Sequence, residues 1–211
     1  MNNSRPSQEL RAHVTQQVTR LQERLQSGAP SALRDTANLR RAVGKPAGSV
    51  PDVYAITLAG LPERLEGAGN NPSRGENIAH LTVSLFALHA QSATRPVHQN
   101  GIGFGSALQK FVMTTGVETV DDSPLMRRIK ALLTADTLDE ISVHLRGLIQ
   151  QLRTESIPFD YGQLSEDLWW LSQEGHRNGV RLKWSRQLYT RPIHNTDDDE
   201  TSNVTPEGSP L

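Results

Sequence analysis

The sequence predicts an all-α protein of eight to nine helices, arranged as two small helical bundles. Three observations support this fold class. Apolar residues recur at steps of three and four along much of the chain, the spacing of one face of a helix. Serine, threonine, aspartate and proline stand where helices would begin. No segment has a convincing strand pattern, and no repeat recurs at a fixed period.

The first 100 residues are expected to form an N-terminal helical subdomain. An amphipathic helix should end at Ser27-Gly28, and Ser31 could cap the next helix, which runs to Val43. Pro51 begins a short helix over 51–59, and residues 60–75, rich in glycine, proline and asparagine, form a loop. A further helix spans 76–91. The apolar face of the first helix comprises Leu10, Val14, Val18, Leu21 and Leu25.

Residues 101–194 are expected to form a C-terminal helical bundle. It opens on Gly101-Ile-Gly-Phe-Gly, and a glycine-rich helix entry can hold a phosphate. However, no strand precedes these glycines and their spacing is not that of a dinucleotide-binding loop, so we expect close packing of the helix start instead. Ser123-Pro124 then begins a helix that ends near Thr134.

Three more helices follow, and the first has the clearest pattern. Its apolar residues lie on one stripe, and Thr137 with Glu140 forms a capping box at its start. Asp160 begins the second, which should bury one of Trp169 and Trp170, and the third buries Val180, Trp184 and Leu188. The stripe of the first helix comprises Leu138, Ile141, Leu145, Leu148, Ile149 and Leu152.

The charge of the chain is unevenly distributed. The 211 residues have a formal net charge of −1, but positions 195–211 hold five acidic residues and no lysine or arginine. Positions 1–194 therefore carry 22 basic and 18 acidic residues, a net charge of +4. We expect this acidic tail to be disordered. It either keeps the protein soluble or competes with nucleic acid for the basic body.

Several functions are disfavoured by what the sequence lacks. There is no cysteine, so a disulfide framework, a thiolate metal site and a cysteine nucleophile are excluded. His80 and His89 are nine residues apart and do not share a helix face as metal ligands would, and the adjacent carboxylates lie at helix starts. No hydrophobic run approaches the ~18 residues of a membrane span, and the first six residues are polar. We expect a cytoplasmic protein without catalytic site, metal or cofactor.

What remains is a set of basic clusters on several helices. Arg40 and Arg41 fall in a last helical turn, where the helix dipole alone would favour cations. Arg146 and Arg153 are seven residues apart and share one flank of their helix. With few aromatic side chains for base stacking, contact with phosphates regardless of sequence is the better interpretation. The candidate nucleic-acid-binding residues are Arg40, Arg41, Arg74, Lys110, Arg127, Arg128, Lys130, Arg146, Lys183 and Arg186, with Lys45 and Arg153 in the same clusters.

The order and spacing of several motifs give the chain a family resemblance. It resembles the CasB small subunit of Cascade, the surveillance complex of type I-E CRISPR systems. The resemblance covers roughly residues 10–191. The matching stretches are Leu-Arg-Arg-Ala-Val-Gly at 39–44, the glycine-rich entry at 101–108, Arg-Arg-Ile at 127–129, and the run from Val143 through Trp169-Trp170 to Tyr189.

The resemblance implies an all-α, non-catalytic subunit. Two copies would lie against the CasC backbone, with the CasA large subunit as a further partner. Their basic surface would steady the guide RNA–target DNA hybrid and the displaced DNA strand. Where other members have further arginines, this chain has Thr134 and Gly147, so its groove would either be less basic or use Lys110 and Lys130 instead. The residues that carry over are Arg40, Arg41, Arg74, Arg127, Arg128 and Arg146.

A second hypothesis is a helical adaptor that binds only protein, with its cations as solvated faces. Salt-sensitive binding of DNA by the isolated chain would separate the two hypotheses.

Overall fold

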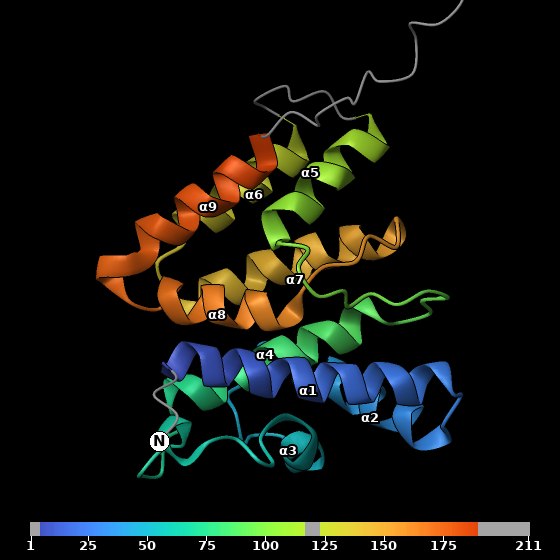
Figure 1. Ribbon diagram of the computed structural model, residues 1–211, viewed down its shortest axis with the longest axis vertical. Helices are drawn as coiled ribbons and strands as arrows, with labels where there is room; N and C mark the ends of the chain where they lie inside the picture. The colour runs from blue at the N-terminus through green and yellow to red at the C-terminus, as the bar shows by residue number, and fades with distance from the viewer. Residues whose placement is uncertain (1–4, 117–122, 190–211) are drawn as a thin grey trace, which may run out of the picture.

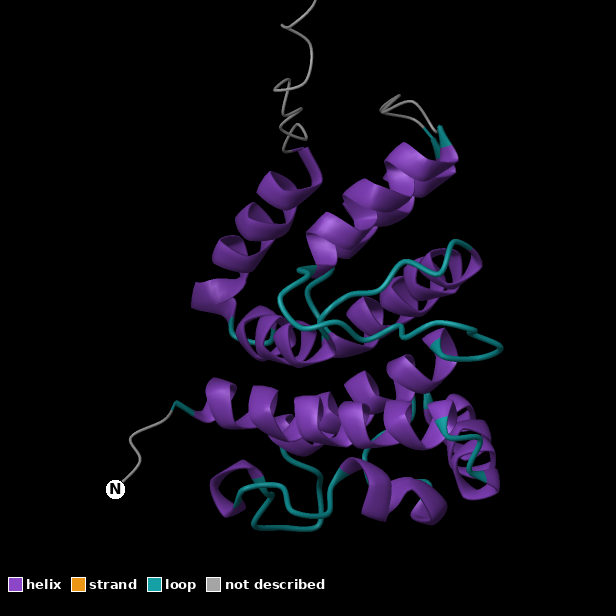
Figure 2. Cartoon of the chain, turned by 45° about the vertical axis from the view of Figure 1, so that its right-hand side comes forward, coloured by secondary structure: helices purple, strands orange, loops and turns teal. Residues whose placement is uncertain are grey.

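The computed structural model describes residues 5–116 and 123–189, which form nine α-helices and two 3-10 helices. The all-α fold class is therefore confirmed (Figures 1 and 2). The only β-type pairing in these residues is an isolated bridge between His98 and Phe159. The helices are α1 (Pro6–Gln26), α2 (Pro30–Ala42), α3 (Pro51–Thr57), η1 (Glu63–Leu65), α4 (Arg74–His89), α5 (Phe104–Thr115), α6 (Pro124–Thr134), α7 (Leu138–Thr154), α8 (Tyr161–Leu171), η2 (Glu174–His176) and α9 (Arg177–Tyr189).

Helix α4 is the centre of the molecule. Every residue from Ile78 to His89 is buried, polar ones included. Helices α1, α2, α3, α7 and α8 all pack on it, as Figure 1 shows. Because the helix is buried on all sides, a hydroxyl on it has no access to water and is stabilised by a hydrogen bond within the protein. The Thr82 hydroxyl donates such a bond to the carbonyl oxygen of Ile78 at 2.7 Å.

The second half of the chain packs on the first mainly through three helix pairs. Helix α8 lies along α1 and also packs on α4, and α7 lies against α4. Farther from the first half, α9 packs on α5 and α8, and α6 packs on α7; Figure 1 shows α7 behind α8 and α6 behind α9. One continuous cluster of buried apolar side chains runs through both halves. The predicted division into subdomains at about residue 100 stays a prediction.

Most of the expected helix starts are found where the sequence placed them. Thr137 and Glu140 form the capping box of α7, and the Asp160 carboxylate accepts the backbone N–H of Gln163 at 2.9 Å. The Ser31 prediction was wrong, because α2 begins at Pro30 without a side-chain cap. The Ser31 hydroxyl instead accepts a hydrogen bond from Arg24 at 3.0 Å.

The glycine-rich entry at residues 101–105 packs closely, as expected. A Cβ atom built on Gly103 would overlap the Gln187 side chain, and one on Gly105 would lie 2.7 Å from the carbonyl oxygen of Trp184. Only glycine lets α5 approach α9 this closely.

Trp169 and Trp170 are both half-buried, so the expectation that one of them is buried was wrong. The buried apolar face of α8 is formed by Leu164, Leu168 and Leu171 instead. The acidic tail at 195–211 and the Asp121-Asp122 pair lie outside the described residues.

Candidate nucleic-acid interface

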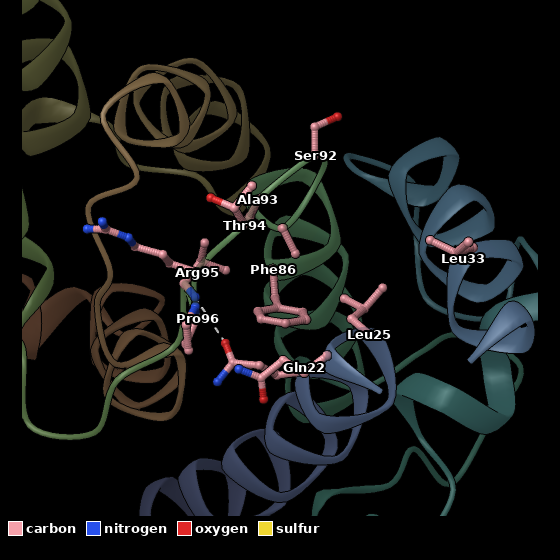
Figure 3. Close-up of a pocket in the computed structure, with 12 residues that line it drawn as sticks. Gln22, Leu25, Leu33, Phe86, Ser92, Ala93, Thr94, Arg95 and Pro96 are labelled. Atoms are coloured by element: carbon pink, nitrogen blue, oxygen red, sulfur yellow. Dashed lines mark hydrogen bonds between the residues drawn. The ribbon is translucent and has the colours of Figure 1, made fainter. Parts of the chain in front are cut away.

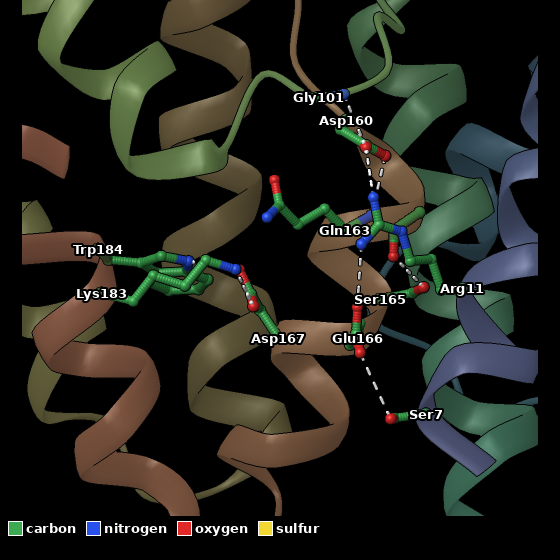
Figure 4. A network of polar contacts seen from close by, with 11 residues as sticks. Ser7, Arg11, Gly101, Asp160, Gln163, Ser165, Glu166, Asp167, Lys183 and Trp184 are labelled. Atoms are coloured by element: carbon green, nitrogen blue, oxygen red, sulfur yellow. Dashed lines mark hydrogen bonds and ion pairs between the residues drawn. The ribbon is translucent and has the colours of Figure 1, made fainter. Parts of the chain in front are cut away.

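Several cations on α1, α9 and the 3-10 helix η1 are engaged in ion pairs. Arg11 binds the carboxylates of Asp160 and Glu166, each at 3.2 Å, and so ties α1 to α8 (Figure 4). Further pairs join Arg24 to Asp35, Arg64 to Glu9, and both Arg177 and Arg181 to Asp136. These cations hold helices together.

Lys183, one of the predicted site residues, is also engaged in this way. Its ammonium group lies 2.7 Å from the carboxylate of Asp167, which also accepts the indole N–H of Trp184 at 2.8 Å (Figure 4). Burial raises the pKa of Asp167, and the charge of Lys183 opposes that rise. This lysine neutralises a buried carboxylate between α8 and α9.

Four arginines on α2, α6 and α7 are different. Arg40 and Arg41 lie in the last turn of α2, Arg128 is exposed on α6, and Arg146 is exposed on α7. Among the described residues, none of these four forms an ion pair. Arg11, Arg177 and Arg181, by contrast, form ion pairs with carboxylates.

Arg40 on α2 and Arg153 on α7 lie close enough for their charges to interact. Burial lowers the pKa of Arg40, and the nearby charges of Arg153 and then Arg41 lower it further. Arg153 is held by a neutral acceptor, because its guanidinium donates to the amide oxygen of Gln91 at 2.8 Å. Like charges held close together favour an anion between them.

Arg128, on α6, packs against α7. Its side chain lies across α7 at Gly147, where a built Cβ atom would be 3.2 Å from Arg128 Cδ and Nε and 3.3 Å from Cζ. Gly147 directly follows the exposed Arg146. The position where the family resemblance suggested a missing arginine is thus covered by the guanidinium of Arg128. We call the set of arginines Arg40, Arg41, Arg128, Arg146 and Arg153, on α2, α6 and α7, the basic face.

The other predicted site residues lie elsewhere or on neighbouring surfaces. Arg74, at the start of α4, lies over the ring of Trp169 with 5.5 Å to the ring centroid, a cation–π contact. Lys110 is exposed on α5 and Arg186 on α9, the helix pair that packs away from α2. Arg127 and Lys130 are exposed on α6 beside Arg128.

Sequence reasoning missed Gln91 as the residue that positions Arg153. The seven-residue spacing of Arg146 and Arg153 was the available signal for the α7 flank. No comparable signal existed for Gln91, which is 62 positions away in sequence.

The described residues line several surface pockets. One of about 320 Å³ lies between α1, α2, α4 and the loop at 92–97 (Figure 3). Arg95 is the only charged residue that lines this pocket. The amide oxygen of Gln22 holds the loop in place by accepting hydrogen bonds from the N–H groups of Val97 and His98 at 3.0 and 2.9 Å. In the described residues no group of three or more histidine, aspartate or glutamate side chains is placed to hold a metal ion. None of the helices described there is long and apolar enough to cross a membrane.

The described residues define an all-α protein in which several arginines of α2, α6 and α7 have no carboxylate partner among those residues. The chain belongs to the family of CRISPR-associated protein Cse2, whose model matches residues 35–189. This is the CasB family expected from the sequence motifs.

Solved structures of the family have the same fold. CasB from Thermobifida fusca is 27% identical and superposes with a TM-score of 0.71, covering 86% of this chain and 98% of its own. A Cse2-family protein from Thermus thermophilus is 22% identical with a TM-score of 0.58, covering 85% of this chain and 97% of its own. Comparison with the curated proteins gives no significant match.

Proposed function

We propose that this protein is the non-catalytic small subunit of a type I-E Cascade and that its basic face binds nucleic-acid backbone. There it stabilises the guide RNA–target DNA hybrid and the displaced strand of the R-loop. Its partners are the CasC backbone, the CasA large subunit and a second copy of itself. Family membership supports the place in the complex, and the basic face supports the contact with nucleic acid.

One observation carries the binding proposal: the division of the cations into two groups. Arg11, Arg177 and Lys183 neutralise carboxylates, whereas Arg40, Arg41, Arg128 and Arg146 form no ion pair within the described residues. Gathering like charges without a counter-ion costs free energy, and a polyanion recovers that cost.

The chemistry needed for this role is modest. Exchange of a DNA duplex for an RNA–DNA hybrid is nearly balanced in free energy, so contacts to the backbone are enough to shift it. Arginine suits such contacts, because its planar guanidinium can bind two phosphate oxygens at once. No base needs to be read, and no bond is made or broken.

The test is binding of labelled duplex and single-stranded DNA by the full chain over a range of salt concentrations. The double variant Arg41→Ala/Arg128→Ala should reduce the slope of log K against log salt by about 1.8 for duplex and about 1.4 for single strands, since two phosphate contacts are lost. In assembled Cascade the same variant should weaken target binding and leave assembly intact.

Two controls match this variant. Arg41→Lys/Arg128→Lys keeps both charges and should preserve the salt slope. Arg20→Ala removes a cation that is exposed on α1, outside the basic face, and should change little. Equal binding by parent and double variant would leave the protein-only adaptor as the better hypothesis.

A further inference from the structure

The pocket between α1, α2, α4 and the loop at 92–97 has largely apolar walls (Figure 3). Leu33 on α2 lines this pocket and is nevertheless 63% exposed. The other apolar lining residues are Leu25, Phe86, Ala90, Ala93, Pro96 and Val97. The volume of about 320 Å³ is at the lower end of the roughly 300–1,000 Å³ of ligand sites, so the pocket has room for one large side chain but not for a cofactor.

The loop that forms one wall of this pocket is held in place by Gln22. Besides the two N–H groups that its amide oxygen accepts, its Nε2 donates to the carbonyl oxygen of His98 at 3.2 Å. At the start of the loop, Ser92 has a φ of 59°, a left-handed conformation that is uncommon for a residue with a Cβ atom and that its surroundings must hold. A pocket that is already formed binds without the free-energy cost of ordering a loop.

The charge at the pocket is positive. Arg95 is exposed, and within the described residues it forms no ion pair. Residues 92–97 include no aspartate or glutamate. A second cation approaches the start of the loop, because Arg153 of α7 donates to the amide oxygen of Gln91, the residue before Ser92. These charges favour an occupant that carries carboxylates.

The walls of the pocket suit a protein side chain better than a nucleobase. Stacking of a base needs an exposed aromatic face, and Phe86, the aromatic residue that lines the pocket, is 0% exposed. Recognition of a base edge needs free amide groups, but the amide of Gln22 is already engaged by the loop. Aliphatic walls with a charge at the rim are typical of a pocket that receives a hydrophobic anchor residue of a partner protein.

We propose that this pocket is a docking site for an acidic segment of a partner protein. The segment inserts one bulky apolar side chain between Leu25, Leu33 and the loop, and its flanking carboxylates pair with Arg95. The buried anchor supplies most of the affinity, and the charges at the rim select the partner. This inference goes beyond the proposed function, because it needs no contact with nucleic acid.

The experiment titrates the isotope-labelled full chain with a synthetic peptide and follows the backbone amides of Ala93, Thr94 and Val97 by NMR. The probe is acetyl-Glu-Glu-Trp-Glu-Glu-amide. One anchor side chain with one exposed ion pair should give a dissociation constant of the order of 1 mM. A peptide with alanine in place of tryptophan should bind at least about tenfold more weakly, because the anchor is lost. A peptide with lysine in place of glutamate should bind about three- to tenfold more weakly.

Charge reversal at the rim locates the contact. Arg95→Glu should weaken binding of the acidic peptide about three- to tenfold and remove its advantage over the lysine peptide. Arg20→Glu makes the same change of charge at an exposed position of α1 that does not line the pocket, so the preference should remain. Leu33→Ser should weaken binding of the tryptophan peptide about threefold, because an apolar wall is lost. All three positions are exposed, so the spectra of the free variants should show an intact fold.

Several results would overturn the docking site. One is the absence of shifts at these amides up to about 10 mM peptide, and another is equal binding of the tryptophan and alanine peptides. A preference for the acidic peptide that survives Arg95→Glu would place the contact elsewhere. Stronger shifts of the same amides with oligothymidylate would assign the pocket to nucleic acid, and shifts that depend on protein concentration without peptide would assign it to a second copy of the chain. None of these measurements varies Arg41 or Arg128, so the proposed function is tested separately.

Discussion

Replacement of Lys183 by alanine should destabilise the fold, although Lys183 stands among the cations first expected to bind nucleic acid. Its Nζ atom lies 2.7 Å from Asp167 Oδ1, and the side chains are 35% and 4% exposed. The alanine variant leaves Asp167 with one strong donor, the indole N–H of Trp184 at 2.8 Å. A buried carboxylate would then be without its counter-charge.

The magnitude follows from the burial of the two partners. Removal of one partner from a fully buried ion pair costs about 3–5 kcal/mol. Solvent reaches a third of the Lys183 side chain, so we expect about 2–3 kcal/mol. By contrast, Arg146→Ala on the basic face should change the free energy of unfolding by less than about 0.5 kcal/mol, because Arg146 is exposed and forms no ion pair within the described residues.

Urea denaturation followed by circular dichroism measures both variants. A pH series adds an internal check. Burial raises the folded-state pKa of Asp167 above its ordinary value, and loss of Lys183 raises this pKa further. The folded variant therefore binds a proton more readily than the unfolded chain does, and the cost of Lys183→Ala should shrink as the pH falls from 7 toward 5.

Two results would refute this reasoning. A cost for Lys183→Ala below about 0.5 kcal/mol would mean that the ion pair contributes nothing to stability. A cost that persists unchanged in an Asp167→Asn background would mean that the lysine acts through other contacts, since a double-mutant cycle isolates the pair.

Three further predictions concern the core and the basic face. Gly147→Ala should raise the helix stability of α7 by up to about 1 kcal/mol in urea denaturation, yet weaken DNA binding in anisotropy assays by displacing Arg128. Burial lowers the pKa of His89 to about 3, so the unfolded chain alone takes up its proton, and stability should fall by about 2 kcal/mol between pH 7 and pH 5; a His89→Gln variant should show a weaker dependence in the same denaturation series. Asp160→Ala should cost about 3 kcal/mol in thermal or urea unfolding, because this buried carboxylate caps α8 and accepts from Arg11 and from the Gly101 N–H.

The helices themselves could be predicted because their determinants are local. The spacing of Leu145, Leu148 and Leu152 defines a buried stripe wherever the helix packs, and the capping box of Thr137 needs only three following residues. The position of α4 could not be predicted. Its apolar pattern indicated one buried face, but burial on every side depends on five other helices that close around it.

The family motifs predicted candidate nucleic-acid-binding residues, which helical periodicity alone could not do. Arg40, Arg41, Arg128 and Arg146 were selected by their place in ordered motifs, and the structure places them on α2, α6 and α7 without carboxylate partners among the described residues. Lys183 could not be told apart from them in sequence, because Asp167 is 16 positions away on another helix.

The sequence by itself therefore determined the fold class, most helix starts and the existence of an excess of cations over the first 194 residues, because these depend on composition and on short spacings. Only the tertiary structure decided which cations are neutralised. An ion pair forms within about 4 Å, and that distance is set by how helices far apart in the chain pack against one another.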